Sequence, residues 1–341
     1  MKSFSGRARA SLTILAIILL ASCQRADVEQ RAEFLVFGTQ VQVVVRDLTE
    51  VQAEIVFARL GHDFQRMHNE WHPWDPGPLN DLNQGLAEGG WVSTTPDLIT
   101  LIEASQTLEQ RSDGLFNAAI GALVRRWGFH TSRYPITEPP PDETEIQTLL
   151  LRQPSTLDIQ IDGQRVRSTN RAVHLDFGGI AKGLAARQAC ERLAEYQSVD
   201  AMIDLGGDVM ICGPTTKPWR VALSDGRRGV LTTVEIAERM AIFTSGNYYR
   251  YGDFNGQRHA HILDPNTGRP VGEVMQATAI DPDPLTADAA ATALVVAGPL
   301  LWQSVARNMG AEHALIIDSD GNVQATEELA ATIENQKVKG D

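Results

Sequence analysis

Two Asp-x-Gly-Gly turns constrain the fold of this chain more than any other feature. The first lies in VHLDFGGIAKGLAARQA, residues 173–189, and the second lies in AMIDLGGDV, residues 201–209. Each follows an apolar run typical of a strand, and the first continues into an alanine-rich segment typical of a helix. We therefore predict a strand, a tight turn and a helix that begins near Ile180, followed by a second strand and turn.

Lys182 lies in the first turn of this predicted helix, on the stripe of small and apolar residues that continues to Leu193, so it should point inward. An inward lysine beside a helix N-terminus requires an anion, because burial disfavours its charge and the helix end is itself partly positive. Asp176 could be that anion. Glycine amides at a helix N-terminus also hold phosphate, although neither a Walker A loop nor G-x-G-x-x-G is present. In the second turn, Asp204 and Asp208 could be purely structural.

The rest of the pattern mixes hairpin-like and helix-crossover spacings. This mixture predicts an α+β fold with mixed or antiparallel sheets flanked by helices. Thr95 and Pro96 have the residue types of a helix cap and first turn. The expected elements are a strand over 34–47 interrupted by Gly38, helices over 51–67 and 95–111, irregular proline-rich segments at 68–83 and 135–145, and strand, strand, helix, strand and strand from Ile159.

The N-terminus predicts an exported lipoprotein. Three cations precede the apolar run LTILAIILL, which is too short for a comfortable permanent membrane span, and the following LASC resembles a lipobox with Cys23 as the lipidated residue. An ordinary signal peptide or an uncleaved anchor is the alternative. The expected organisation is a lipoprotein signal peptide at 1–22, a tether at 23–33, a domain at 34–330 and a C-terminal tail at 331–341, held on the periplasmic side of a bacterial membrane.

Charge and cysteine content limit which binding partners and which cellular compartment are expected. Cleavage after residue 22 removes three cations and no acids, so the formal net charge moves from −13 to −16. No dense Lys/Arg block with interleaved aromatics occurs, so no nucleic acid is expected as a partner. Cys190 and Cys212 could pair in an oxidising compartment, but neither has a Cys-x-x-Cys or metal-ligand spacing. We expect them to be two isolated buried thiols.

Two later segments carry groups suited to chemistry. In RHAHILD, strand alternation places His259, His261 and Leu263 on one face, ahead of an Asp-Pro-Asn-Thr-Gly turn. A lone histidine at such a position is usually a hydrogen-bonded structural residue. The nearby serine-glycine turn, tyrosines and arginine make a site the other interpretation.

In TADAAATAL, Thr286 is the expected N-cap of a helix rich in small residues. Asp288 and Thr292 lie four residues apart and face the same way. A carboxylate and a hydroxyl suit Mg²⁺, which takes few protein ligands and completes its shell with water and phosphate. An aspartate near the cap with an unrelated threonine is the other interpretation.

Seven segments occur in the order found in the ApbE family, the FAD:protein FMN transferases, and the chain resembles that family over most of its length. They are FGTQ, DGLFNAAIGALVRRWGF, LDFGGIAKG, IDLGGDV, TSGNYYRY, HILDPNTGRP and TADAAATAL. The resemblance implies an ApbE-like, T-fold-related domain with two lobes. It also implies Mg²⁺-dependent transfer of FMN from FAD through a phosphoester bond to a threonine of an acceptor protein, with release of AMP. The acceptor would be a membrane redox complex subunit or an FMN-binding domain protein.

Two other functions use the same residues. An FAD pyrophosphatase would let water replace threonine and release FMN and AMP. A non-catalytic periplasmic FAD-binding lipoprotein would leave FAD intact.

The resemblance also assigns roles to individual residues. His261 is the implied catalytic base, and its ordinary pKa of about 6.5 suits this work. Asp288, Thr292 and the backbone carbonyl of Gly179 are the implied Mg²⁺ ligands. Trp74 is an implied aromatic contact, in a loop whose spacing departs from the family pattern. The other implied FAD contacts are Phe37, Leu115, Phe116, Asn117, Asp176, Lys182 and Leu263.

Three positions depart from the common family pattern. Phe37 replaces a methionine, which fits a contact made by the backbone. Asn117 and Ala291 replace aspartates found in many or some members. The implied metal site therefore has few carboxylates, and its affinity or metal preference could differ.

Overall fold

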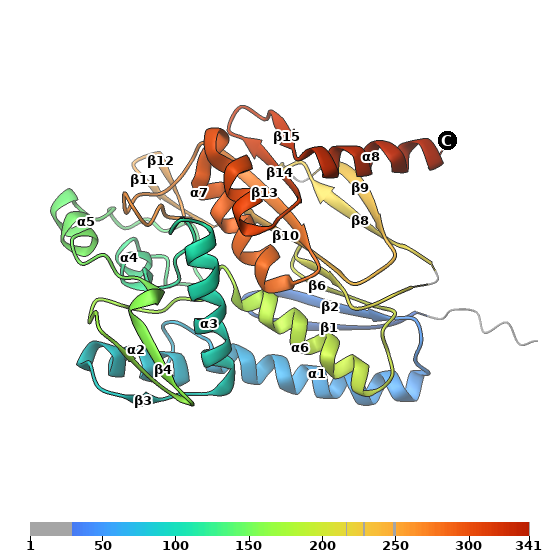
Figure 1. The fold of residues 1–341 in the computed structure, drawn as a ribbon, viewed down its shortest axis with the longest axis horizontal. Helices are drawn as coiled ribbons and strands as arrows, with labels where there is room; N and C mark the ends of the chain where they lie inside the picture. Colours follow the sequence, from blue (N-terminus) through green and yellow to red (C-terminus); the bar gives the residue numbers. More distant parts are fainter. Residues whose placement is uncertain (1–28, 216, 228, 248–249, 341) are drawn as a thin grey trace, which may run out of the picture.

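The computed structural model describes residues 29–340 except 216, 228 and 248–249 (Figure 1). The predicted signal peptide, Cys23 and the first part of the predicted tether lie outside the described residues. The described chain is α+β, as expected, and the pairings between its named strands are antiparallel.

An eight-stranded sheet forms the centre of the larger lobe (Figure 1). Three of its seven neighbouring pairs of strands are joined by short turns, two by segments that contain a hairpin, and two by segments that contain helices. The strand order is β1 (Gln30–Val36), β2 (Thr39–Val45), β6 (Ala201–Leu205), β7 (Val209–Ile211), β10 (Met240–Gly246), β13 (Val274–Asp281), β14 (His313–Asp318) and β15 (Val323–Ala325).

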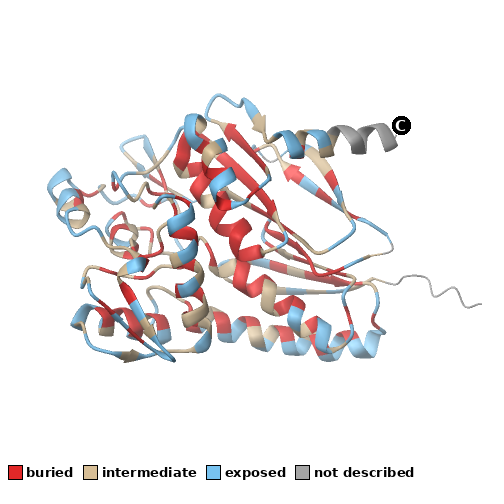
Figure 2. Ribbon diagram, in the orientation of Figure 1, coloured by how far each residue is buried: buried red, intermediate tan, exposed pale blue. Residues whose placement is uncertain are grey.

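Each face of this sheet is buried in its own apolar cluster. Along β2, Val41, Val43 and Val45 belong to the main core and Val44 belongs to the second, as alternation along a strand requires. Helices cover the first face, and a hairpin with one helix covers the second (Figures 1 and 2). The helices on the first face are α1 (Glu50–Glu70), α6 (Ala181–Glu195) and α7 (Pro284–Met309), and α3 (Pro96–Arg111) packs against α7. The elements on the second face are β8 (Trp219–Ser224), β9 (Val230–Ile236) and α8 (Glu327–Gly340).

Short elements form a smaller lobe on the left of Figure 1. Part of this lobe shares the main core, and another part has a small core of its own around Trp127. Its elements are α2 (Pro78–Glu88), β3 (Val92–Ser93), α4 (Gly121–Arg126), α5 (Glu143–Leu150), η1 (Thr156–Asp158), β4 (Ile159–Asp162), β5 (Arg165–Ser168), β11 (Tyr251–Phe254) and β12 (Gln257–Ala260).

Helix α7 is long and apolar enough to cross a membrane by length and composition alone. Its first half is almost entirely buried in the main core, which gives a helix inside a protein the same composition. Gly298, with a φ of 69°, and Pro299 break its helical path. The apolar character of α7 is therefore explained by packing within the protein.

The predicted strand over 34–47 is instead part of a hairpin. Strand β1 begins at Gln30, so the last residues assigned to the tether belong to the sheet. Phe37 and Gly38 form a two-residue turn, and both have left-handed φ values, 56° and 70°. Such turns match the twist of the flanking strands, but a left-handed φ is strained for phenylalanine.

The two proline-rich segments expected to be irregular, 68–83 and 135–145, are irregular only in part, because a helix begins inside each. Pro78 begins α2, and Asp142 caps α5, which begins at Glu143. Proline suits the first turn of a helix because an amide there has no partner within the helix. Similarly, α7 is capped by Asp283 with Pro284 next, not by Thr286. Of the residues expected as a tail, 331–340 continue helix α8.

Cys190 and Cys212 form a disulfide, which corrects the expectation of two isolated thiols. Cys190 lies on α6, and Cys212 directly follows β7. The two meet because α6 packs across the sheet that contains β7, an arrangement that their spacing in the sequence does not reveal. The bond ties the helix that carries Lys182 to the sheet.

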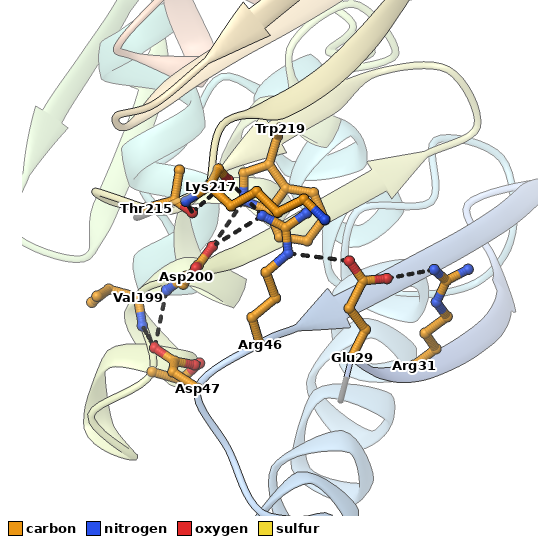
Figure 3. Close-up of polar contacts among 10 residues, drawn as sticks. Glu29, Arg31, Arg46, Asp47, Val199, Asp200, Thr215, Lys217 and Trp219 are labelled. Carbon is orange, nitrogen blue, oxygen red and sulfur yellow. Dashed lines mark hydrogen bonds and ion pairs between the residues drawn. The ribbon is translucent and has the colours of Figure 1, made fainter. Parts of the chain in front are cut away.

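The open end of the β1–β2 hairpin is held by a cluster of polar groups around Arg46 (Figure 3). Its guanidinium lies 3.4 Å from the ring centroid of Trp219 and bonds to Glu29 at 3.1 Å and to the Lys217 carbonyl at 2.6 Å. Asp200 lies 3.9 Å away. These contacts fasten the start of the described chain to the β8–β9 hairpin.

Candidate active site

The N-termini of α6 and α7 meet at the centre of the candidate site. A Cβ on Gly183, in the first turn of α6, would lie 2.5 Å from the carbonyl oxygen of Pro284. The Gly183 amide donates to Oδ2 of Asp288 at 2.9 Å. Any side chain at position 183 would separate the helices. Asp288 is thereby held at the positive end of α6, where a carboxylate is favoured.

The three residues predicted to bind magnesium lie together. A Cβ on Gly179 would lie 3.0 Å from Oγ1 of Thr292, which is one helical turn from Asp288. The Thr292 hydroxyl also hydrogen-bonds that of Ser245 at 2.9 Å. The first diglycine turn and the late alanine-rich helix therefore lie side by side, as the predicted site requires.

These groups are chemically suited to Mg²⁺. Within the described parts of the chain, no three His, Cys, Asp or Glu side chains gather to hold a metal, and Asp288 is the one carboxylate among the three predicted ligands. Burial raises the pKa of Asp288 to about 6, although the charge of Lys182 opposes this rise. A buried carboxylate that lacks full charge compensation, beside neutral oxygens, fits a cation shared with a phosphate ligand.

Lys182 pairs with Asp208 of the second diglycine turn, not with Asp176 as considered from the sequence. Asp208 is buried and also accepts a hydrogen bond from the Thr244 amide at 2.7 Å. Burial lowers the pKa of Lys182, whereas the charge of Asp288 raises it. The second turn thus supplies a carboxylate for a lysine that the first turn positions.

The two diglycine turns use glycine for different reasons. Gly206 and Gly207 have left-handed φ values of 76° and 102°, and a Cβ on Gly206 would clash with Thr39. Gly179, by contrast, allows a close approach to Thr292, since a Cβ at this position would lie only 3.0 Å from Oγ1. Glycine serves backbone conformation and tight packing in the second turn, and close packing in the first.

Asp176 is held by His130, a residue that the sequence did not point to. Nε2 of His130 lies 3.0 Å from Oδ2 of Asp176, and the Gly178 amide donates to Oδ1 at 2.9 Å. Burial alone would raise the pKa of Asp176, but the hydrogen bond and charge of His130 bring it below its ordinary value. Asp176 therefore remains ionised without Lys182.

Trp74 lies between two histidine rings. It stacks on His130 with centroids 5.1 Å apart and meets the edge of His72 at 4.4 Å. Burial lowers the pKa of His72, which keeps this ring neutral. His130 therefore contacts both the half-buried indole and Asp176, so two predicted FAD contacts share one neighbour despite the unusual loop spacing.

The other predicted FAD contacts differ in how they are placed. Phe37 stacks on Trp71 at 6.4 Å in its strained turn. Phe116 is buried, with a ring atom 3.4 Å from the Cβ position of Gly179, and Leu115 packs against the main core.

The side chains of Asn117 and Leu263 make contacts within the protein itself. Both ends of the Asn117 amide bond to backbone groups, at 2.9 and 2.8 Å. Leu263 is buried in the small core around Trp127.

His261 directly follows β12, so the expected alternation with His259 ends before it. Its Nδ1 lies 3.1 Å from the carbonyl oxygen of Arg250. A carbonyl can only accept, so Nδ1 carries the proton and Nε2 of the neutral ring is free to accept one. Burial, reinforced by the charge of Arg250, lowers the pKa of His261 to about 4 rather than leaving it near neutrality.

Three side chains join this site beyond those assigned to it from the sequence: His130, Asp208 and Ser245. Each lies in or just after a segment shared with the ApbE family, and that position was the available signal. His130 is 46 residues from the Asp176 that it holds. Only the tertiary fold brings them together.

Comparison with known sequences identifies a family that covers most of the chain. The sequence model of the ApbE family matches residues 37–316. An FAD:protein FMN transferase of Rhodobacter capsulatus is 40% identical over 303 residues, which span 88% of this chain and 58% of that protein. One from Haemophilus influenzae is 28% identical over 71% of this chain and 72% of that protein.

Solved structures agree with the sequence match. The ApbE protein of Thermotoga maritima superposes with a TM-score of 0.81 at 30% identity, over 89% of this chain and 99% of that chain. The flavin transferase ApbE of Vibrio cholerae, at 22% identity, shares the fold with a TM-score of 0.77, over 89% of this chain and 99% of that chain. The match over residues 37–316, together with this shared fold, shows that the chain belongs to the ApbE family.

Proposed function

We propose that this protein transfers FMN from FAD to a threonine hydroxyl of an acceptor protein, releases AMP, and requires Mg²⁺. Relatives named FAD:protein FMN transferase support the reaction class. The observation that carries the proposal is the meeting of Gly179, Asp288 and Thr292. Oxygen ligands beside a helix N-terminus suit a cation and a diphosphate bound together.

In the proposed reaction, the threonine oxygen attacks the phosphorus of the FMN half of FAD. The bond between that phosphorus and the bridging oxygen breaks, and the bridging oxygen leaves with AMP. The threonine proton passes to Nε2 of His261. The Arg250 carbonyl keeps the opposite nitrogen of this ring protonated, which fixes the tautomer that a base requires.

Asp288, Thr292 and the Gly179 carbonyl would hold the magnesium ion. When bound, the ion supplies positive charge that stabilises the diphosphate and the departing AMP. Lys182 adds a cation at the N-terminus of α6 and is itself held by Asp208. Trp74 offers an aromatic face for a ring of FAD, stacked on the His130 that holds the ionised Asp176.

Mass spectrometry of the acceptor tests the proposal. The full-length protein in detergent, given FAD, Mg²⁺ and a threonine-containing acceptor, should add one FMN to the acceptor and release AMP. An acceptor with threonine replaced by valine should stay unmodified, and Asp288→Asn should abolish the transfer.

Two outcomes would contradict the proposal. Free FMN and AMP without modified acceptor would indicate an FAD pyrophosphatase. Intact FAD, bound but never consumed, would indicate a binding protein.

We further propose that Cys23 is lipidated and holds the enzyme on the periplasmic side of the membrane, where its acceptor also lies. The LASC sequence supports lipidation. The Cys190–Cys212 disulfide supports export, because such bonds persist mainly in oxidising compartments. Cys23→Ser should abolish incorporation of labelled palmitate and release the protein from the membrane fraction. A protein that stays unlabelled in the wild type would contradict lipidation.

A further inference from the structure

Arg250 links two parts of the candidate site. Its carbonyl oxygen accepts the hydrogen bond from Nδ1 of His261 at 3.1 Å. Its guanidinium lies over the turn between β1 and β2, where a Cβ on Gly38 would be 3.4 Å from Nη2. One residue, just before β11, therefore touches both the candidate base and the Phe37–Gly38 turn.

The guanidinium of Arg250 is exposed and, among the residues that the structure describes, makes no hydrogen bond or ion pair of its own. Lys182, the other cation of the site, is paired with Asp208. In a chain with a net charge of −13, carboxylates to pair with an arginine are plentiful. The fold has placed none of the described ones at this position.

The charge of Arg250 reaches the other groups of the site. Burial is the first cause of the lowered pKa of His261, and the positive charge of Arg250 is the second. Burial likewise lowers the pKa of Lys182, and Arg250 adds to this effect while Asp288 opposes it. The two cations repel each other across the site. An anion bound between them would relieve this repulsion.

We propose that Arg250 is a substrate-binding residue that holds the diphosphate of FAD from the side opposite Lys182. The inference rests on the proposed function, because it names a further contact to the same donor substrate. A guanidinium can donate two parallel N–H groups to phosphate oxygens, which a lysine cannot do. During transfer, the same charge stabilises the oxygen that leaves with AMP.

Equilibrium binding of three ligands isolates this contact. The full-length protein in detergent is titrated with FAD, with riboflavin, which lacks phosphate, and with ADP, which lacks flavin. Arg250→Gln should lower the affinity for FAD and for ADP by about 10- to 100-fold, the range expected for a charged hydrogen bond. Its affinity for riboflavin should be unchanged. Arg250→Lys should recover part of the loss because the charge remains. Arg220→Gln, on β8 with a side chain 74% exposed, is the matched control and should bind all three ligands normally.

Turnover provides a second measurement. Arg250→Gln should lower kcat/KM for FMN transfer by a similar factor, and its melting temperature should match that of the wild type. Unchanged affinity for FAD and ADP in Arg250→Gln would overturn the inference. So would an equal loss of riboflavin affinity, which would assign Arg250 to packing against the Phe37 turn. A wild type that binds FAD but transfers no FMN would overturn the proposed function while leaving the binding result interpretable.

Discussion

The two ends of the β1–β2 hairpin place an arginine in opposite situations. At the open end, the side chain of Arg46 is only 9% exposed, and it lies over Trp219 with Glu29 and Asp200 beside it (Figure 3). At the turn end, Arg250 lies over Gly38, exposed and without a described partner for its guanidinium. The first cation is satisfied by the protein itself. The second is left for something that the protein binds.

The same contrast extends to the backbone. The open end of the hairpin continues its regular pairing, from Gln30 opposite Val45. The turn end holds Phe37 in a left-handed conformation that costs free energy. Strain and unpaired charge therefore occur at the end that faces the candidate site, while the other end is fully paired. We expect substitutions at the two ends to separate activity from stability.

The largest expected effect is at the site end, on His261. His261→Asn should lower kcat by about 10²- to 10⁴-fold, because the general base is lost. The free energy of unfolding should change little, since among the described residues the ring makes one hydrogen bond, to the Arg250 carbonyl. Steady-state transfer assays and urea unfolding on the same preparation measure both quantities. An active variant would remove His261 from the mechanism.

The pH dependence of the wild type sharpens this prediction. With a pKa of about 4 in the free protein, His261 is neutral and able to accept a proton throughout the range above about pH 5. No loss of kcat/KM through protonation of His261 is therefore expected between pH 8 and about pH 5.5. An acid limb near pH 6.5 that disappears in His261→Asn would contradict the lowered pKa.

The next largest effect is expected at the open end. Arg46→Met should lower the free energy of unfolding by about 2–4 kcal/mol, because the partly buried carboxylates of Glu29 and Asp200 lose their cation and Trp219 loses its stacking partner. The kcat of the folded fraction should remain that of the wild type. Denaturant unfolding and active-site titration distinguish the two effects. A large fall in kcat without loss of stability would break the comparison between the two ends.

The sequence predicted much of the scaffold where local chemistry decides the structure. Thr95 and Pro96 cap and begin α3, as expected, and the order of strands and helix after Ile159 is confirmed. The predicted start of α7 at Thr286 was wrong although the sequence contains the correct one. Asp283 before Pro284 is a better helix start, because the aspartate caps the helix and proline suits its first turn. Proline in the segment around Pro78 likewise marked a helix start and not only a loop.

Contacts across long sequence separations could not be predicted from local pattern. The Lys182–Asp208 pair, the His130–Asp176 bond and the Cys190–Cys212 disulfide each join segments that meet only after the sheet and helices have packed. The proximity of Gly179 to Thr292 was anticipated because the family resemblance named both. No spacing rule connects a diglycine turn to a helix more than a hundred residues later.

A smaller effect is expected from His174, whose buried Nδ1 has no hydrogen-bond partner among the described residues. Burial lowers its pKa to about 4, with the charges of Arg125 and His130 contributing. The unfolded chain therefore takes up a proton on His174 near pH 6.5, while the folded chain does not. The stability that comes from keeping His174 neutral is full above about pH 6.5 and is lost as the pH falls toward 4. The loss should amount to about 1–2 kcal/mol, less than the full shift implies because the ring is only half-buried.

His174→Gln tests this contribution by difference. Other groups, including Asp288 with its raised pKa, also titrate in this range and affect both proteins alike. Urea unfolding at pH 4.5, 5.5, 6.5 and 7.5 should show a shallower fall in stability toward acid pH for the variant than for the wild type. Parallel curves would show that His174 takes no part in acid destabilisation.

The smallest effect is expected from Arg31, which belongs to the same open-end cluster as Arg46 but lies on its outside. Arg31 bonds to Glu29 at 2.5 Å, yet its side chain is 60% exposed, so water and salt screen the pair. Arg31→Ala should therefore change the free energy of unfolding by less than about 0.5 kcal/mol, and less still in high salt. If urea unfolding instead gave a loss comparable to that of Arg46→Met, the stability of this end would come from the charge network as a whole. If Arg31→Ala loses little stability and Arg46→Met loses much, the stability of this end comes from the burial of the Arg46 guanidinium against Trp219. Arg250 lacks such a partner among the described residues.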